Sequence, residues 1–185
     1  MKHLKGFNYP ADNFRYGIDE PHVFDNFLED KKFLPIFDAM KAPAFPWRMT
    51  KILDDTEDNY LTNIQMAHMF YDHFSPEDES INLLFPILEA IDPISILKIK
   101  ANVLTKTDTI IEHGLHNDIE NRLDCPFIKT AILYMNTCNG YTKFSNGEQV
   151  DSIQNRFVVF PNSMEHTGST TTNSPFRMVI NINYI

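Results

Sequence analysis

The chain contains the stretch His113-Gly114-Leu115-His116-Asn117-Asp118, which follows a run of residues that predicts a strand. His116 and Asp118 are two residues apart, and side chains at that spacing on an extended backbone point the same way. A metal ion with positions left open for chemistry needs a further protein ligand, and His166 is the only histidine downstream. The sequence therefore predicts a metal site formed by His116, Asp118 and His166. His113 lies three residues before His116, so we expect its side chain to face away and to have a structural or supporting role.

Two histidines and one carboxylate on one face of an octahedron leave three positions free, an arrangement typical of non-haem Fe(II) oxygenases. Two further features follow in order along the chain. Arg177 comes eleven residues after His166, and the segment 131–136, which carries Tyr134, runs into Asn139-Gly140-Tyr141-Thr142-Lys143-Phe144. Over residues 94 to 184 this ordered set resembles the 2-oxoglutarate/Fe(II)-dependent oxygenases, within them the prolyl-4-hydroxylase-like branch. Asn139 stands where that family has the first Gly of a Gly-Gly-x-Thr-x-Phe loop.

The resemblance implies an Fe(II) centre, 2-oxoglutarate as co-substrate and O2. It implies that Arg177 holds the far carboxylate of 2-oxoglutarate, with Tyr134 as a second donor and Thr142 and Asn102 as weaker candidates for the same pocket. The family often has a Tyr near Leu104, so an aliphatic residue here leaves that contact missing or replaced.

The residues themselves support a binding role for Arg177. It alternates with the apolar residues Met178, Ile180 and Ile182, so it faces the other side of its predicted strand. A buried guanidinium needs an anionic partner, and a carboxylate matches its planar fork. The alternative is a salt bridge to one of the chain's own acids, and Tyr134 is alternatively an ordinary core tyrosine.

Composition bounds the class of protein. A length of 185 residues suits one domain, and 16 basic against 25 acidic residues give a formal charge of −9, which opposes non-specific binding to nucleic acid or anionic lipid. The chain has no run of eighteen apolar residues and no signal-peptide core at its start, so we expect a soluble, cytoplasmic protein. Cys125 and Cys138 form no framework and are expected to be reduced.

The first half of the chain predicts helices and one strand pair. Asp25 is an expected N-cap, Pro35 predicts a kink or two short helices, and Ser80 occupies a capping position. The expected elements are a helix over 25–40, strands over 47–53 and 64–71, and a helix over 80–91.

From residue 94 the apolar pattern changes to period two, which indicates strands with two distinct faces. Helices first and short antiparallel strands afterwards predict an α+β fold: a double-stranded β-helix, or cupin-like jelly roll, with supporting N-terminal helices. We expect residues 1–185 to form one domain, mixed over 1–93 and a jelly-roll core over 94–185. The expected strands of the core are 94–104, 109–116, 128–136, 148–152, 156–160 and 176–184.

The predicted function is that of a dioxygenase, in particular a hydroxylase, that couples decarboxylation of 2-oxoglutarate to succinate with oxidation of a C–H bond. The alternatives are a cupin-like metal-binding module and a cupin enzyme that uses the same ligands without 2-oxoglutarate. The sequence does not identify the prime substrate, which is a peptide or a small molecule. The prolyl-hydroxylase resemblance favours peptidyl proline. Arg122 and Tyr71 are the expected substrate contacts, because each lies in a segment that can reach over the metal end of the barrel. The oligomeric state is left open.

Overall fold

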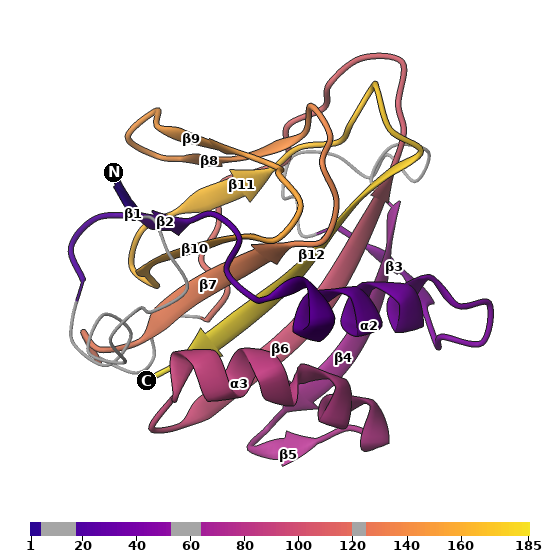
Figure 1. Ribbon diagram of the computed structural model, residues 1–185. Helices are drawn as coiled ribbons and strands as arrows, with labels where there is room; N and C mark the ends of the chain where they lie inside the picture. The colour runs from indigo at the N-terminus through magenta and orange to yellow at the C-terminus, as the bar shows by residue number, and fades with distance from the viewer. Residues whose placement is uncertain (5–17, 53–63, 120–124) are drawn as a thin grey trace.

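The computed structural model describes residues 1–4, 18–52, 64–119 and 125–185. Within them the chain forms two β-sheets, with helices on one side of the larger sheet (Figure 1). The larger sheet has the strand order β1-β2-β10-β7-β12-β6-β4-β3, with β5 paired to β4, and the smaller sheet has the order β11-β8-β9. The strands of the larger sheet are β1 (Lys2–Leu4), β2 (His22–Phe24), β3 (Arg48–Lys51), β4 (Ile64–Asp72), β5 (Ser75–Pro76), β6 (Ile96–Thr105), β7 (Lys129–Tyr134), β10 (Arg156–Pro161) and β12 (Phe176–Tyr184). Those of the smaller sheet are β8 (Tyr141–Phe144), β9 (Gln149–Asp151) and β11 (His166–Gly168).

Helices cover one face of the larger sheet. They are α2 (Asp30–Lys41), the 3-10 helix η1 (Glu79–Leu84) and α3 (Phe85–Ile91). Their buried side chains pack against every second residue of the central strands, and full burial of each such side chain stabilises the fold by about 1.5–3 kcal/mol. This core includes Phe33, Ile36, Met40, Ile87 and Ile91 from the helices and Ile99, Ala101, Val103, Met178, Ile180 and Ile182 from the strands.

The smaller sheet packs over the opposite face of the larger one, and a second apolar cluster lies between them. Ile132 and Val179 from the larger sheet meet Phe144 and Val150 from the smaller sheet. Successive residues of a strand point to opposite faces, so each strand serves both cores: Ala131 and Leu133 of β7 join the helix-side core, and Ile132 and Tyr134 join the core between the sheets. This double-sheet arrangement confirms the predicted jelly-roll fold, and it encloses the space in which the candidate site lies.

The helix boundaries differ from the predictions. The first helix begins at Asp30, because Asp25 forms an ion pair with Arg156 at 2.6 and 3.0 Å instead of capping a helix. Pro35 lies on the exposed side of one continuous helix, so the predicted division into two short helices is wrong. The predicted helix over 80–91 is a 3-10 turn followed by α3, and its cap is Asp78, which accepts a hydrogen bond from the backbone N–H of Ser80.

Most of the predicted strands are confirmed, including the antiparallel pair β3 and β4. The strand expected over 109–116 is wrong, because only Glu112 and His116 make isolated bridges there. No strand was predicted at β8 or β11, which are too short to show a period. In the described residues, no helix is long and apolar enough to cross a membrane.

Candidate metal centre and co-substrate pocket

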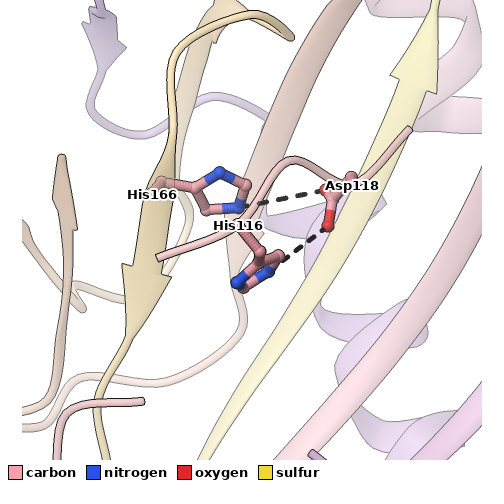
Figure 2. A group of neighbouring side chains, drawn as sticks. All are labelled: His116, Asp118 and His166. Atoms are coloured by element: carbon pink, nitrogen blue, oxygen red, sulfur yellow. Dashed lines mark ion pairs between the residues drawn. The ribbon is translucent and has the colours of Figure 1, made fainter. Parts of the chain in front are cut away.

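The three predicted metal ligands meet at the end of the cavity between the sheets. The backbones of His116 and His166 exchange two hydrogen bonds of 3.0 Å, which places their rings 4.8 Å apart between centroids. His116 Nε2 lies 3.8 Å from Asp118 Oδ1, and His166 Nε2 lies 4.0 Å from Asp118 Oδ2 (Figure 2). One ligand atom from each residue lies within 4.8 Å of the others, so the three converge on one point.

Both histidines are held in a form that suits a metal ligand. His116 Nδ1 is 3.0 Å from the carbonyl oxygen of Gly114, an acceptor, so Nδ1 carries the proton and Nε2 presents its lone pair to the cluster. Burial lowers the pKa of His166, and the Asp118 carboxylate opposes that shift. The neutral imidazole, which is the ligating form, is therefore favoured at His166.

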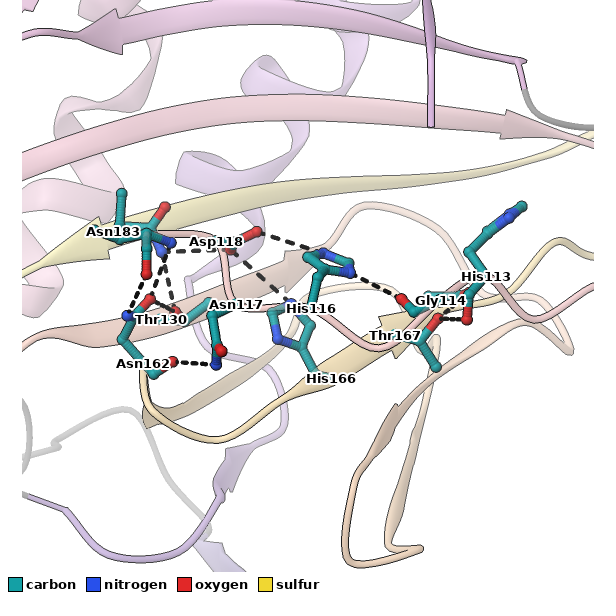
Figure 3. A network of polar contacts seen from close by, with 12 residues as sticks. His113, Gly114, His116, Asn117, Asp118, Thr130, Asn162, His166, Thr167 and Asn183 are labelled. Carbon is teal, nitrogen blue, oxygen red and sulfur yellow. Dashed lines mark hydrogen bonds and ion pairs between the residues drawn. The ribbon is translucent and has the colours of Figure 1, made fainter. Parts of the chain in front are cut away.

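A chain of polar side chains fixes Asp118 in place. Asn183 Nδ2 donates to Asp118 Oδ2 at 3.3 Å and to Thr130 Oγ1 at 3.0 Å. The Thr130 hydroxyl donates to Asn162 Oδ1, and Asn162 Nδ2 donates to the carbonyl of Ile119 (Figure 3). Carboxylate ligands are commonly oriented by such outer partners. Sequence reasoning missed Asn183, although a polar residue between Ile182 and Tyr184 on a buried strand is a signal that could have identified it.

Arg177 lies deep in the same cavity and is only 3% exposed. Its Nη2 donates to Thr142 Oγ1 at 3.0 Å, and its Cζ is 5.5 Å from the centroid of the Tyr134 ring. No carboxylate of the described residues lies within 4.0 Å of this guanidinium, and its buried Nε has no hydrogen-bond partner. Because an uncompensated buried charge is strongly unfavourable, this geometry fits an anionic ligand.

Two glycines make room for Arg177. A Cβ on Gly140 would lie 2.6 Å from Arg177 Cδ, and one on Gly168 would lie 3.2 Å from its Nη1. Asn139, which departs from the family's loop, accepts hydrogen bonds on its side-chain oxygen from Thr171 Oγ1 and from the backbone N–H of Thr172. These hydrogen bonds tie Asn139, the neighbour of Gly140, to the facing segment.

The cavity that joins the cluster to Arg177 has a volume of about 90 Å³. One water needs roughly 10–15 Å³ on this measure, so there is space for one small dicarboxylate. The residues that line this cavity include Lys98, Lys100, Asn102, Leu104, His113, His116, Asp118, Thr142, His166, Arg177, Asn181 and Asn183.

Several predicted residues occupy positions that differ from expectation. His113 lines the same cavity, so the prediction that it faces away is wrong; residues 113–116 are not a regular strand, and its spacing from His116 therefore does not fix its direction. It is nevertheless outside the ligand cluster. Tyr134 is fully buried and donates to Thr142 Oγ1 at 2.8 Å, one step behind the cavity wall.

Of the two predicted substrate contacts, the structure describes only Tyr71, which is not in the cavity wall. Tyr71 packs against the helix-side core, because its place on β4 turns it to that face. Arg122 lies outside the described residues. Sequence reasoning did not select Lys98 and Lys100, whose alternation with Ile99 and Ala101 marks them as residues of the cavity face.

No protein-family model and no curated protein matches the sequence of this chain. Solved structures do match. An oxidoreductase of the 2OG-Fe(II) oxygenase family from Burkholderia pseudomallei aligns with a TM-score of 0.62 at 12% identity, over 99% of this chain and 94% of its own. The chain has the fold of the 2OG-Fe(II) oxygenases.

Two further structures with this fold are of enzymes named for different reactions. A prolyl hydroxylase from Trichoplax adhaerens, solved with a hypoxia-inducible-factor peptide, aligns with a TM-score of 0.65 at 11% identity, over 95% of this chain and 86% of its own. The non-haem α-ketoglutarate-dependent carbocyclase SnoK aligns with a TM-score of 0.65 at 13% identity, over 94% and 82%. At these identities the likeness establishes a common fold, and the chemistry has to be argued from the site.

Proposed function

We propose that this protein is an Fe(II)- and 2-oxoglutarate-dependent dioxygenase, in particular a hydroxylase. The observation that carries the proposal is Arg177: a buried guanidinium without a carboxylate partner among the described residues, in the same cavity as a His, Asp and His cluster. A metal-binding module would need the cluster alone. A binding site for a dicarboxylate co-substrate needs the cation as well.

The donor set fits Fe(II). His116 and His166 supply two imidazole nitrogens and Asp118 one carboxylate oxygen, a combination that suits non-haem iron and leaves coordination positions open. Bound Fe(II) with 2-oxoglutarate and O2 supplies the oxidising chemistry, in which 2-oxoglutarate becomes succinate and CO2 and one oxygen atom enters the substrate.

The chain's own residues bind and orient these groups. The Asp118 carboxylate would offset part of the metal charge. The hydrogen bond from Asn183 holds this carboxylate in place beside the two histidines. Arg177 grips the far carboxylate of the co-substrate, while Thr142 holds the guanidinium in place and is itself held by the hydroxyl of Tyr134. Asn102 lines the cavity with a side-chain oxygen that has no hydrogen-bond partner among the described residues, and we assign it to the wall of the co-substrate pocket.

We propose that residues 1–185 form one oxygenase domain, which the near-complete overlap with the Burkholderia pseudomallei structure supports. The prime substrate is a peptide or a small molecule. The peptide bound to the Trichoplax adhaerens neighbour supports a peptidyl substrate, and proline is one candidate within that class.

Anaerobic titration tests the proposal. Wild-type protein is expected to bind Fe(II), then 2-oxoglutarate, and to form succinate when oxygen is admitted. His116→Ala and His166→Ala should lose Fe(II) binding and keep the fold, because each removes one of three ligands. His113→Ala is the matched control and should bind Fe(II) as the wild type does.

Two outcomes would contradict the assignment. Loss of the metal in His113→Ala with binding intact in His116→Ala would show that the ligands are wrong. Fe(II) binding by wild type without 2-oxoglutarate binding would indicate a cupin-type module or an enzyme that does not use this co-substrate.

A further inference from the structure

Strand β6 directs two lysines into the cavity. Lys98 and Lys100 line it together with Asp118, while Ile99 and Ala101, between and beside them, are buried in the helix-side core. Both lysine side chains belong to residues that are partly buried. Neither is needed to hold the metal, and Arg177 already serves the co-substrate.

These lysines have no carboxylate partner. Across the described residues, no acidic side chain lies within 4.0 Å of either ammonium group, whereas Lys32 pairs with Glu89 and Lys143 with Glu112. Among the described residues, Asp118 is the acidic residue that lines the cavity with them. Burial, and next the charge of Lys98, lowers the pKa of Lys100, and the Asp118 carboxylate opposes this shift only in part, so two like charges share a partly desolvated space. An anion would relieve both effects.

The backbone positions of the lysines are displaced along β6 from the position that pairs with Arg177. Arg177 is the β12 partner of Leu104, while Lys100 and Lys98 are partners of Asn181 and Asn183. Four residues of strand separate Leu104 from Lys100, which is about 13 Å. The end carbons of 2-oxoglutarate are roughly 5–6 Å apart, given C–C bonds near 1.5 Å. The lysines therefore belong to the metal end of the cavity, where Asn183 contacts Asp118.

An unpaired acceptor lies beside the two cations. The side-chain oxygen of Asn181, opposite Lys100, is buried, finds no hydrogen-bond partner in the part of the chain that the structure describes, and lines the same cavity. A ligand that satisfies all three groups carries an anion and, next to it, an N–H donor. An N-acylated amino acid or the carboxyl end of a peptide has this chemistry.

We infer that Lys98 and Lys100 bind an anionic group of the prime substrate, a carboxylate or a phosphate, with Asn181 accepting a hydrogen bond from an adjacent N–H. The inference rests on the proposed function and narrows its substrate to acids. When the lysines hold the anion, the C–H bond to be oxidised would lie between them and the metal ligands.

The test uses the full chain loaded with Mn(II) and saturating 2-oxoglutarate, without oxygen. The probes are N-acetylglycine, methyl phosphate and the neutral N-acetylglycinamide, and the measurement is relaxation of each probe's methyl protons by Mn(II). The variants are Lys98→Met, Lys100→Met and the double substitution. Lys31→Met removes the same charge from exposed α2, where Lys31 pairs with Glu29, and serves as the control.

We expect at least one anion to bind near the metal in wild type and in Lys31→Met. The neutral amide should bind with an affinity lower by about tenfold or more. The double variant should weaken the anion by about tenfold or more and leave the affinity for 2-oxoglutarate unchanged. The ratio of the affinities for N-acetylglycine and methyl phosphate then identifies carboxylate or phosphate as the group recognised.

The inference is overturned if the amide binds as well as the acids, or if the anions keep their affinity in the double variant. It is also overturned if the lysine variants lose 2-oxoglutarate, because the lysines would then serve the co-substrate. Failure of the proposed function is a separate result: wild type that binds no 2-oxoglutarate, or an Arg177→Leu variant that binds it as well as wild type.

Discussion

Replacing Arg177 by leucine separates a ligand-binding arginine from a structural one. A structural arginine has a carboxylate partner whose loss destabilises the fold. Arg177 has a single hydrogen bond, to Thr142, and no acidic partner among the described residues. We therefore expect Arg177→Leu to leave the free energy of unfolding, measured without 2-oxoglutarate, unchanged or higher, because it removes a buried charge.

The affinity for 2-oxoglutarate should change in the opposite direction. A hydrogen bond to a charged group contributes about 1.5–3 kcal/mol, which corresponds to a rise of roughly 10- to 150-fold in Kd. At a concentration 100 times the wild-type Kd, 2-oxoglutarate stabilises the folded state by about 2.7 kcal/mol. If Kd rises 100-fold, the same concentration stabilises the variant by only about 0.4 kcal/mol.

Calorimetric titration of the Mn(II)-loaded protein with 2-oxoglutarate measures the affinity. Denaturant unfolding with and without 2-oxoglutarate measures the free energy of unfolding. Arg156→Leu is the matched control, because Arg156 is 9% exposed and pairs with Asp25 through two hydrogen bonds. It should lose about 1.5–3 kcal/mol of stability and keep its affinity for 2-oxoglutarate. The reasoning is refuted if Arg177→Leu binds 2-oxoglutarate normally, or if it loses as much stability as Arg156→Leu.

Three further predictions follow from the contacts around the site. Asn183→Ala removes the hydrogen bond that orients Asp118 and should weaken Fe(II) binding by about 10- to 100-fold in an anaerobic titration; unchanged affinity would show that the hydrogen bond has no such role. Gly140→Ala places a Cβ 2.6 Å from Arg177 Cδ, so calorimetry should show weaker 2-oxoglutarate binding with Fe(II) affinity retained. Hydrogen bonds from Tyr141, the larger effect, and from Lys143 lower the pKa of Glu112 below 4.5, so its stabilising contribution is present above about pH 4.5 and is lost as pH falls through the lower folded value. Glu112→Gln should therefore flatten the loss of stability on acidification, measured by urea midpoints from pH 3 to 7, and an identical acid limb in the two proteins would contradict this.

The sequence alone indicated the jelly roll, because the long strands β6 and β12 carry their own evidence for which face is buried. The alternation of Ile99 and Ala101 with lysines, and of Met178 and Ile180 with Arg177, is local and visible in one dimension. It also predicted that His116, Asp118 and His166 lie together, since the order of motifs along the chain implies a fold that brings them near one another. Their role as ligands stays a prediction for the metal titrations to test.

Other features depend on contacts across the fold, and only the tertiary structure decided them. Asp25 pairs with Arg156, 131 positions away, so the local signal for a helix cap was overridden by a partner that no window of sequence contains. His113 lines the cavity in a segment that is not a regular strand, so its spacing from His116 does not fix the direction of its side chain. The unpaired state of Arg177, Lys98 and Lys100 depends on where every acidic side chain of the described chain lies. A pattern along the sequence shows which residues are present, but whether a buried charge has a partner is set by distances in three dimensions.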